Sequence, residues 1–190
     1  MAGSTEIGAG RRGNPWRIAV WSTAAFLLLL PLVAMQLTKE VNWTPADFVV
    51  FGAMLLAACG TYELATRRSG NTAYRAAVGL AMVGGFLLVW MNLAVGIIGS
   101  EENSANLMFA GVLAVGAIGA FIARFQPHGM AQALVATALA QSLVAVIALI
   151  AGLGEPPLWF LTAFYIALWL TSAALFRKAA REQTPAGPAS

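Results

Sequence analysis

Six long runs of apolar residues alternate along the chain with short segments rich in Pro, Gly, Asn and charged residues. Each run is close to the roughly 20 residues that a helix needs to cross a bilayer. A spanning segment must pair its own backbone polar groups, which favours helices, and the alternating pattern of a membrane barrel is absent. The predicted spans are residues 17–37, 47–64, 76–99, 106–123, 130–152 and 158–176.

The composition agrees with this pattern. Of the 190 residues, 59 % are apolar and 10 % are charged, whereas an average soluble domain has about 25 % charged residues. Six spans leave too few residues for a separate soluble domain. We therefore expect a single all-α, six-helix membrane domain at residues 15–180. The segments 1–14 and 181–190, rich in small and polar residues, are expected to be disordered tails.

The basic residues predict the orientation of the bundle, because Lys and Arg near the ends of spans are retained in the cytoplasm. With the N-terminus inside, ten basic residues are cytoplasmic and only Lys39 lies outside. Both termini are then expected in the cytoplasm. This orientation accounts for the excess of basic residues that gives the chain its net charge of +3. The charge therefore does not require a nucleic-acid partner.

A weak internal similarity indicates three helical hairpins of the same orientation. Related six-residue stretches occur in alternate spans, at residues 32–37, 88–93 and 143–148. An acidic outer loop follows each of them, and the returning spans that begin at Asp47 and Asn106 also align. A threefold repeat explains these matches. The shared Leu, Val and Ala composition of membrane helices explains them equally well.

Polar side chains within the spans are candidates for function, because a polar group in hydrocarbon is costly. The candidate intramembrane positions are Gln36, Asn92 and Gln141. We expect Asn92 about 10 Å below the outer end of its span. The repeat places Gln36 at a similar depth, where the two amides would bond each other or a shared water. Hydrogen bonds between helices and a route for a solute both explain these residues.

Glu63 and Arg67 form the candidate interfacial ion pair. The glutamate precedes the arginine by four residues, the favourable order for an intrahelical pair. The pair lies near the cytoplasmic end of its span, where both side chains can reach the interface. No span carries an acid near its centre, which argues against proton-driven transport through a carboxylate relay.

The outer loops are acidic. The candidate outer-face positions are Glu40, Asp47, Glu101, Glu102 and Glu155. The carboxylates and amides of segment 101–106 are ligands suited to a hard cation such as calcium. A solvated loop in which an Asn or Ser caps the following helix explains the same residues more simply.

The sequence lacks motifs for catalysis or cofactor binding. One cysteine, Cys59, and one histidine, His128, cannot supply a zinc site or two-histidine haem ligation. There is no phosphate-binding glycine loop, metalloprotease helix or nucleophile elbow. We therefore expect no enzyme activity, no cofactor, and no catalytic or metal-binding residue.

Two segments carry a resemblance to known proteins. Residues 91–103 with 105–109 resemble a stretch of a family of small multi-span integral membrane proteins of bacteria for which no activity is established. Residues 40–43 with Asp47 and Phe48 are similar to a companion stretch of that family. The resemblance implies a multi-helix fold in a bacterial inner membrane, and it implies no particular activity.

Two classes of function remain for such a protein. The first is a non-enzymatic scaffold or accessory subunit that packs in the bilayer against itself or a larger membrane complex. The second is a small oligomeric transporter or channel for a small solute or cation. The absence of a central ionisable residue and the short loops favour the scaffold.

Overall fold

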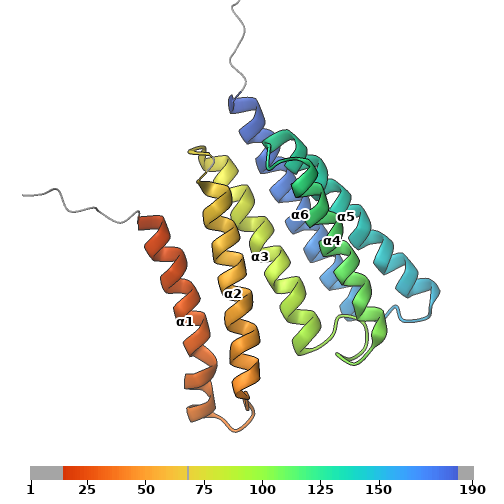
Figure 1. Ribbon diagram of the computed structural model, residues 1–190. Helices are drawn as coiled ribbons and strands as arrows, with labels where there is room; N and C mark the ends of the chain where they lie inside the picture. The colour runs from red at the N-terminus through yellow and green to blue at the C-terminus, as the bar shows by residue number, and fades with distance from the viewer. Residues whose placement is uncertain (1–14, 68, 184–190) are drawn as a thin grey trace, which may run out of the picture. The chain divides into compact units, whose positions relative to one another are not determined.

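The computed structural model describes residues 15–67 and 69–183, and within these residues the chain is all-helical, with no strand. The helices are α1 (Pro15–Leu37), α2 (Pro45–Thr66), α3 (Thr72–Ala94), α4 (Met108–Ile122), α5 (Pro127–Ile150) and α6 (Pro156–Gln183), with a short 3₁₀ helix, η1 (Ser104–Leu107), before α4 (Figure 1). In this described part, six segments are long and apolar enough to cross a membrane. The predicted all-α, six-span fold is confirmed.

Proline marks the start of four helices. Helices α1, α2, α5 and α6 begin at Pro15, Pro45, Pro127 and Pro156. The fixed φ of proline suits the first helical turn, and its missing amide hydrogen would have no intrahelical partner there. These starts lie within a few residues of the predicted ones, because the same prolines interrupt the apolar runs.

The third span ends earlier than predicted. Helix α3 stops at Ala94 rather than at Gly99, because Gly96 has a φ of 77° and turns the chain away from the helix axis. A Cβ atom at Gly96 would lie 2.4 Å from the carbonyl carbon of Ser100, so this turn requires glycine. Asn92 therefore lies in the last turn of α3, and the predicted depth of about 10 Å below the helix end is wrong.

The sixth helix continues beyond the predicted end of its span. Helix α6 continues beyond Phe176 to Gln183, so residues 181–183, expected in the C-terminal tail, are helical. The charged and alanine residues after Phe176 are good helix formers, and Lys178 lies 4.0 Å from Glu182 one turn later. The predicted tails at 1–14 and 184–190 are outside the described residues.

The chain divides into two compact units, Met1–Cys59 and Gly60–Ser190. In the first unit, the ring of Trp43 packs edge-on against Phe48 and Phe51, with centroids 5.1 and 5.3 Å apart. Most of the large apolar side chains of α1 are exposed, as expected for a helix that faces lipid. We call the second unit the C-terminal unit.

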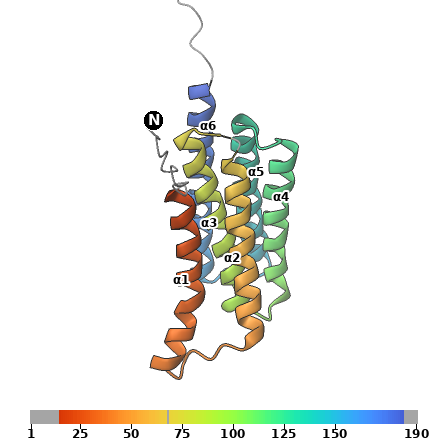
Figure 2. The ribbon, with the colours of Figure 1, turned by 60° about the vertical axis from the view of Figure 1, so that its left-hand side comes forward.

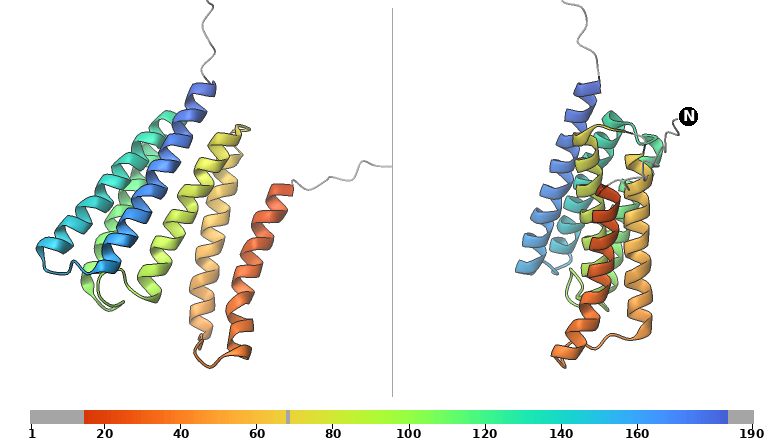
Figure 3. Two further views of the ribbon diagram at one scale, coloured as in Figure 1. Left: turned by 180° about the vertical axis from the view of Figure 1, so that it is seen from behind. Right: turned by 90° about the vertical axis from the view of Figure 1, so that its left-hand side faces the viewer.

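Helix α6 is central to the C-terminal unit. It packs along α3 on one side and along α5 on the other, and α4 packs along α5 (Figure 2, Figure 3). Small residues allow these close contacts: a Cβ atom at Gly84 of α3 would lie 2.9 Å from the ring of Trp169 on α6. The core of the unit therefore depends on close helix packing.

The helix contacts of the C-terminal unit do not support the predicted hairpin repeat. Helices α5 and α6 form a packed hairpin, whereas α3 and α4, which would be the equivalent hairpin, share few contacts. The segment between α3 and α4 folds back on itself after Gly96, and α3 packs on α6 instead. The two hairpins of this unit are therefore not equivalent.

Adding a methyl group at Gly84 tests the contact between α3 and α6. We expect Gly84→Ala to lower the free energy of unfolding by about 1–3 kcal/mol, because the ring of Trp169 must shift. Gly111→Ala on α4 is the matched control, since its Cβ has no neighbour within 4 Å, and it should be neutral or stabilising by up to about 1 kcal/mol. Unfolding in detergent micelles titrated with a denaturing detergent measures both variants. A Gly84→Ala protein as stable as the control variant would contradict this contact.

Candidate functional site

The buried polar residues of the described chain are all uncharged: Asn106, Thr137, Gln141, Thr162 and Ser172. All of them belong to the C-terminal unit. The hydroxyl of Thr137 donates a hydrogen bond to the carbonyl oxygen of Ala133 in its own helix, at 2.9 Å. The hydroxyl of Ser172 on α6 donates to the carbonyl oxygen of Ala77 on α3, at 2.7 Å, and this bond joins the two helices.

Gln141 is the candidate intramembrane residue that the structure buries most completely. It lies in the middle of α5 with no exposed surface. Neither its amide nitrogen nor its carbonyl oxygen has a hydrogen-bond partner among the described residues. The hydroxyl of Thr162 and the indole nitrogen of Trp169, both on α6, are also buried without a partner there. We call these three side chains the α5–α6 polar group.

Helix geometry brings the members of this group to similar depths. Helices α5 and α6 pack as an antiparallel hairpin connected by residues 151–155. Counted from the ends at this connection, Gln141 is level with Tyr165 of α6. Thr162 and Trp169 then lie about one turn to either side, within roughly 6 Å along the axis. Because buried polar groups normally have partners, this group is the strongest candidate for a ligand-binding or hydrogen-bonding site.

Asn92 and Gln36 have different environments from Gln141. The amide nitrogen of Asn92 donates to the carbonyl oxygen of Leu88 in its own helix, at 2.7 Å, and its Oδ1 has no partner within the described chain. Gln36 is exposed in the last turn of α1. Since the two residues belong to different units, their hydrogen bond to each other stays a prediction.

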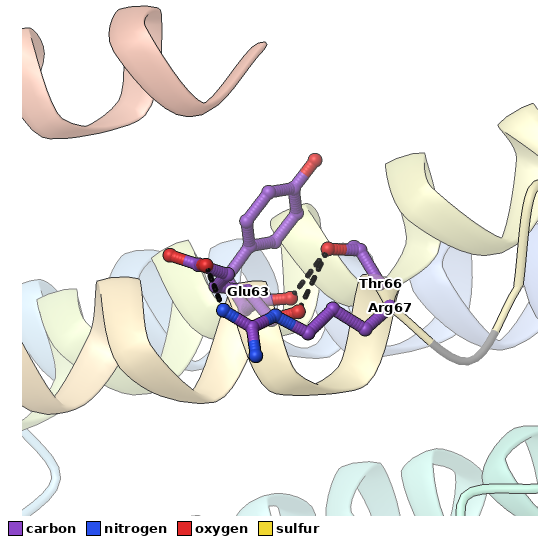
Figure 4. Close-up of polar contacts among 4 residues, drawn as sticks. Glu63, Thr66 and Arg67 are labelled. Carbon is purple, nitrogen blue, oxygen red and sulfur yellow. Dashed lines mark hydrogen bonds and ion pairs between the residues drawn. The ribbon is translucent and has the colours of Figure 1, made fainter. Parts of the chain in front are cut away.

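The structure contains the ion pair that the spacing of Glu63 and Arg67 predicts (Figure 4). Arg67 Nη2 lies 2.5 Å from Glu63 Oε1 near the end of α2, and the arginine and glutamate side chains are 66 % and 14 % exposed. Fully exposed pairs at this spacing contribute about 0.3–0.5 kcal/mol. The hydroxyl of Thr66 donates to the carbonyl oxygen of Tyr62, at 2.8 Å. Both contacts lie at the C-terminal end of α2 and stabilise its last turns.

The outer-face acids have separate environments. Glu40 is exposed, and its backbone N–H donates to the hydroxyl of Thr38. Asp47 accepts hydrogen bonds from the backbone N–H and the hydroxyl of Thr44, at 2.7 and 2.8 Å. The hydroxyl of Thr44 in turn accepts from the backbone N–H of Asp47, which is the reciprocal arrangement of a capping box. Asp47 therefore serves the start of α2.

The remaining outer acids, Glu101, Glu102 and Glu155, are exposed in the turns after α3 and α5. Nowhere in the described residues do three His, Cys, Asp or Glu side chains form a group that could hold a metal ion. Asn103 instead accepts from the backbone N–H of Ala105 and caps η1. This capped turn is the simpler of the two interpretations of segment 101–106.

Asn106 is the polar residue whose role the sequence did not reveal. Its Oδ1 accepts hydrogen bonds from the backbone N–H groups of Ile97 and Ile98, at 3.0 and 2.9 Å. Its Nδ2 donates to the carbonyl oxygens of Ile98 and Ser100, at 3.3 and 2.7 Å. Asn106 is 8 % exposed, and all four of its hydrogen-bonding positions are used.

These bonds organise residues 95–106, which we call the Asn106 loop. The loop buries Ile97 and Ile98 in the core of the C-terminal unit. Gly96 and Gly99 flank the two isoleucines, and both have positive φ. Two glycines around a short apolar stretch, followed by a polar segment, are the sequence signal that could have indicated a turn here.

Comparison of the chain with protein-family models, curated proteins and solved structures finds no match. The resemblance of residues 91–109 to a bacterial family therefore stays a hypothesis. That stretch includes the Asn106 loop, in which the side chain of Asn106 makes four hydrogen bonds to the backbone.

Replacing Asn106 with Ala tests the role of its amide. The variant leaves the N–H groups of Ile97 and Ile98 without partners, so we expect the free energy of unfolding to fall by about 2–4 kcal/mol. Hydrogen exchange of these two amides should also become much faster. Asn103→Ala is the control, because it removes only the cap of η1 and should cost about 1 kcal/mol. Equal effects of the two substitutions would contradict the proposed role of Asn106.

Proposed function

We propose that this protein is a non-enzymatic scaffold or accessory subunit of a bacterial inner membrane. The observation that carries the proposal is the uncharged core, since none of the buried residues in the described part of the chain is an Asp, Glu, Lys or Arg. Proton and ion carriers commonly place ionisable groups within the membrane. A neutral, closely packed core suits a protein that acts through its outer surface.

The surface of α4 supports the same proposal. This helix packs along α5 and exposes Val115, Ile118 and Ile122 on another face. Gly111 lies on that face and has open space around its Cβ position. Apolar helix faces with small residues allow a second membrane helix to approach closely. The face is therefore suited to lipid or to a helix of a larger complex.

The second candidate function is transport of a small neutral solute, and the α5–α6 polar group favours it. The amide of Gln141 offers both donors and an acceptor, Thr162 offers a hydroxyl, and Trp169 offers an N–H donor. A solute with adjacent donor and acceptor groups would match them. No ion is implied, because these three side chains are uncharged.

Gln141→Leu distinguishes the two candidates. For a scaffold, the variant should retain its co-extracted partners in native mass spectrometry. Its stability should stay equal or rise by about 1–3 kcal/mol, because an unpartnered buried amide is removed. Ser142→Ala is the control, since that hydroxyl already donates to Ala138. If folded Gln141→Leu protein instead loses wild-type uptake of urea or glycerol into proteoliposomes, transport is the correct function. A wild type without a stoichiometric foreign subunit would contradict the accessory role.

Reporter fusions test the proposed cytoplasmic location of the termini. Since ten basic residues favour this orientation, green fluorescent protein fused to the C-terminus should fluoresce in a bacterial host. A periplasmic phosphatase fused at the same position should be inactive. Active phosphatase with no fluorescence would reverse the orientation.

A further inference from the structure

The C-terminal unit separates its described charges between its two ends. The described basic residues of this unit are Arg67, Arg75, Arg124, Arg177, Lys178 and Arg181. They lie where α2, α4 and α6 end and where α3 begins, and we call this the basic end. Its acids are Glu63 and Glu182, whereas the other acids of the unit lie in the loops at the opposite end. The basic end therefore has an excess of positive charge.

Hydrogen bonds hold the segments of the basic end together. Asn71, just before α3, donates through Nδ2 to Glu182 Oε2 at the end of α6, at 2.7 Å. The hydroxyl of Tyr74 in α3 donates to the carbonyl oxygen of Phe125, at 3.0 Å, and so joins α3 to the turn between α4 and α5. The ring of Tyr74 also packs edge-on against Phe176. The basic residues on these three segments are therefore held at the same end of the unit.

The acids at this end already have partners. Glu63 pairs with Arg67, and Glu182 lies 4.0 Å from Lys178. The described residues provide no ion-pair partner for Arg124, Arg177 or Arg181, and all three are exposed. The remaining positive charge is therefore available to an external anion.

Arg75 adds a cation closer to the helices. It lies in the first turn of α3 and is half-buried. Its Nε is buried without a hydrogen-bond partner in the described chain. A guanidinium group commonly binds phosphate through two parallel hydrogen bonds, and Nε is one of the donors that such binding uses.

The length of α6 places its two arginines, Arg177 and Arg181, at the depth of the lipid headgroups. From Pro156 to Phe176 the helix carries no charge, and this stretch is about 30 Å long, which matches the hydrocarbon thickness of a bilayer. Arg177 and Arg181 follow directly and lie one turn apart, so they project on the same side. The phosphate layer of the membrane lies at that depth.

We propose that the basic end binds the phosphate of an anionic phospholipid, with Arg75, Arg124, Arg177 and Arg181 as its ligands. The excess positive charge selects an anionic lipid over a zwitterionic one. Arginine, which forms most of this surface, matches phosphate geometry better than lysine does. The assignment does not depend on whether the protein is a scaffold or a transporter.

Competition between lipids tests this assignment. The full chain is reconstituted in nanodiscs with equal amounts of phosphatidylglycerol and phosphatidylcholine, and native mass spectrometry measures which lipid stays bound after gentle release. Wild type should retain phosphatidylglycerol preferentially. The triple variant Arg124→Gln, Arg177→Gln, Arg181→Gln should lose about fivefold of this preference for each cation removed. The corresponding triple lysine variant should keep most of it.

Lys39→Gln is the matched control, because Lys39 is exposed in the loop between α1 and α2 and should leave the preference unchanged. Circular dichroism and thermal unfolding in phosphatidylcholine establish that the variants are folded. If the triple variant is not, the single substitutions at the exposed Arg177 and Arg181 replace it. Equal retention of both lipids by wild type, or an unchanged preference in the folded glutamine variants, would overturn the proposal. Loss of the bound lipid to inorganic phosphate would indicate a soluble anion site instead.

Discussion

Hydrogen bonding away from water is the constraint on which this structure depends. Where a chain leaves a helix in the buried part of a protein, its freed backbone groups need new partners. The Asn106 side chain supplies partners for four such groups after α3 ends. The loop can therefore bury Ile97 and Ile98 in the core. Helix α3 packs on α6, although α4 is its next neighbour in sequence.

The sequence predicted the helices well because an apolar run of spanning length has few alternatives to a helix in a membrane. Residues 95–99 were assigned to the third span for the same reason. They are apolar, but the positive φ of Gly96 and Gly99 is a backbone property that hydropathy does not report. The end of α6 was missed for the opposite reason, since residues 177–183 are polar yet helical. Polarity ends a membrane span without ending its helix.

The candidate site was predictable only where the relation is local. The pair of Glu63 and Arg67 follows from their spacing on one helix. The complete burial of Gln141 does not, because it depends on which faces of α5 meet α4 and α6. The role of Asn106 depends on how the loop folds back, so that its side chain reaches the backbone of residues 97–100. The spacing of residues along a helix does not predict such a contact.

Gln141 is the buried side chain on which the choice between the two candidate functions depends. An unpartnered buried amide costs about 1–3 kcal/mol, and a leucine of similar size would avoid that cost. A bound solute would supply the missing hydrogen-bond partners, and so would another packing of α5 against its neighbours. A scaffold would keep Gln141 enclosed, whereas a transporter would have to expose it. The two functions therefore differ in the mobility of the helices that enclose this side chain.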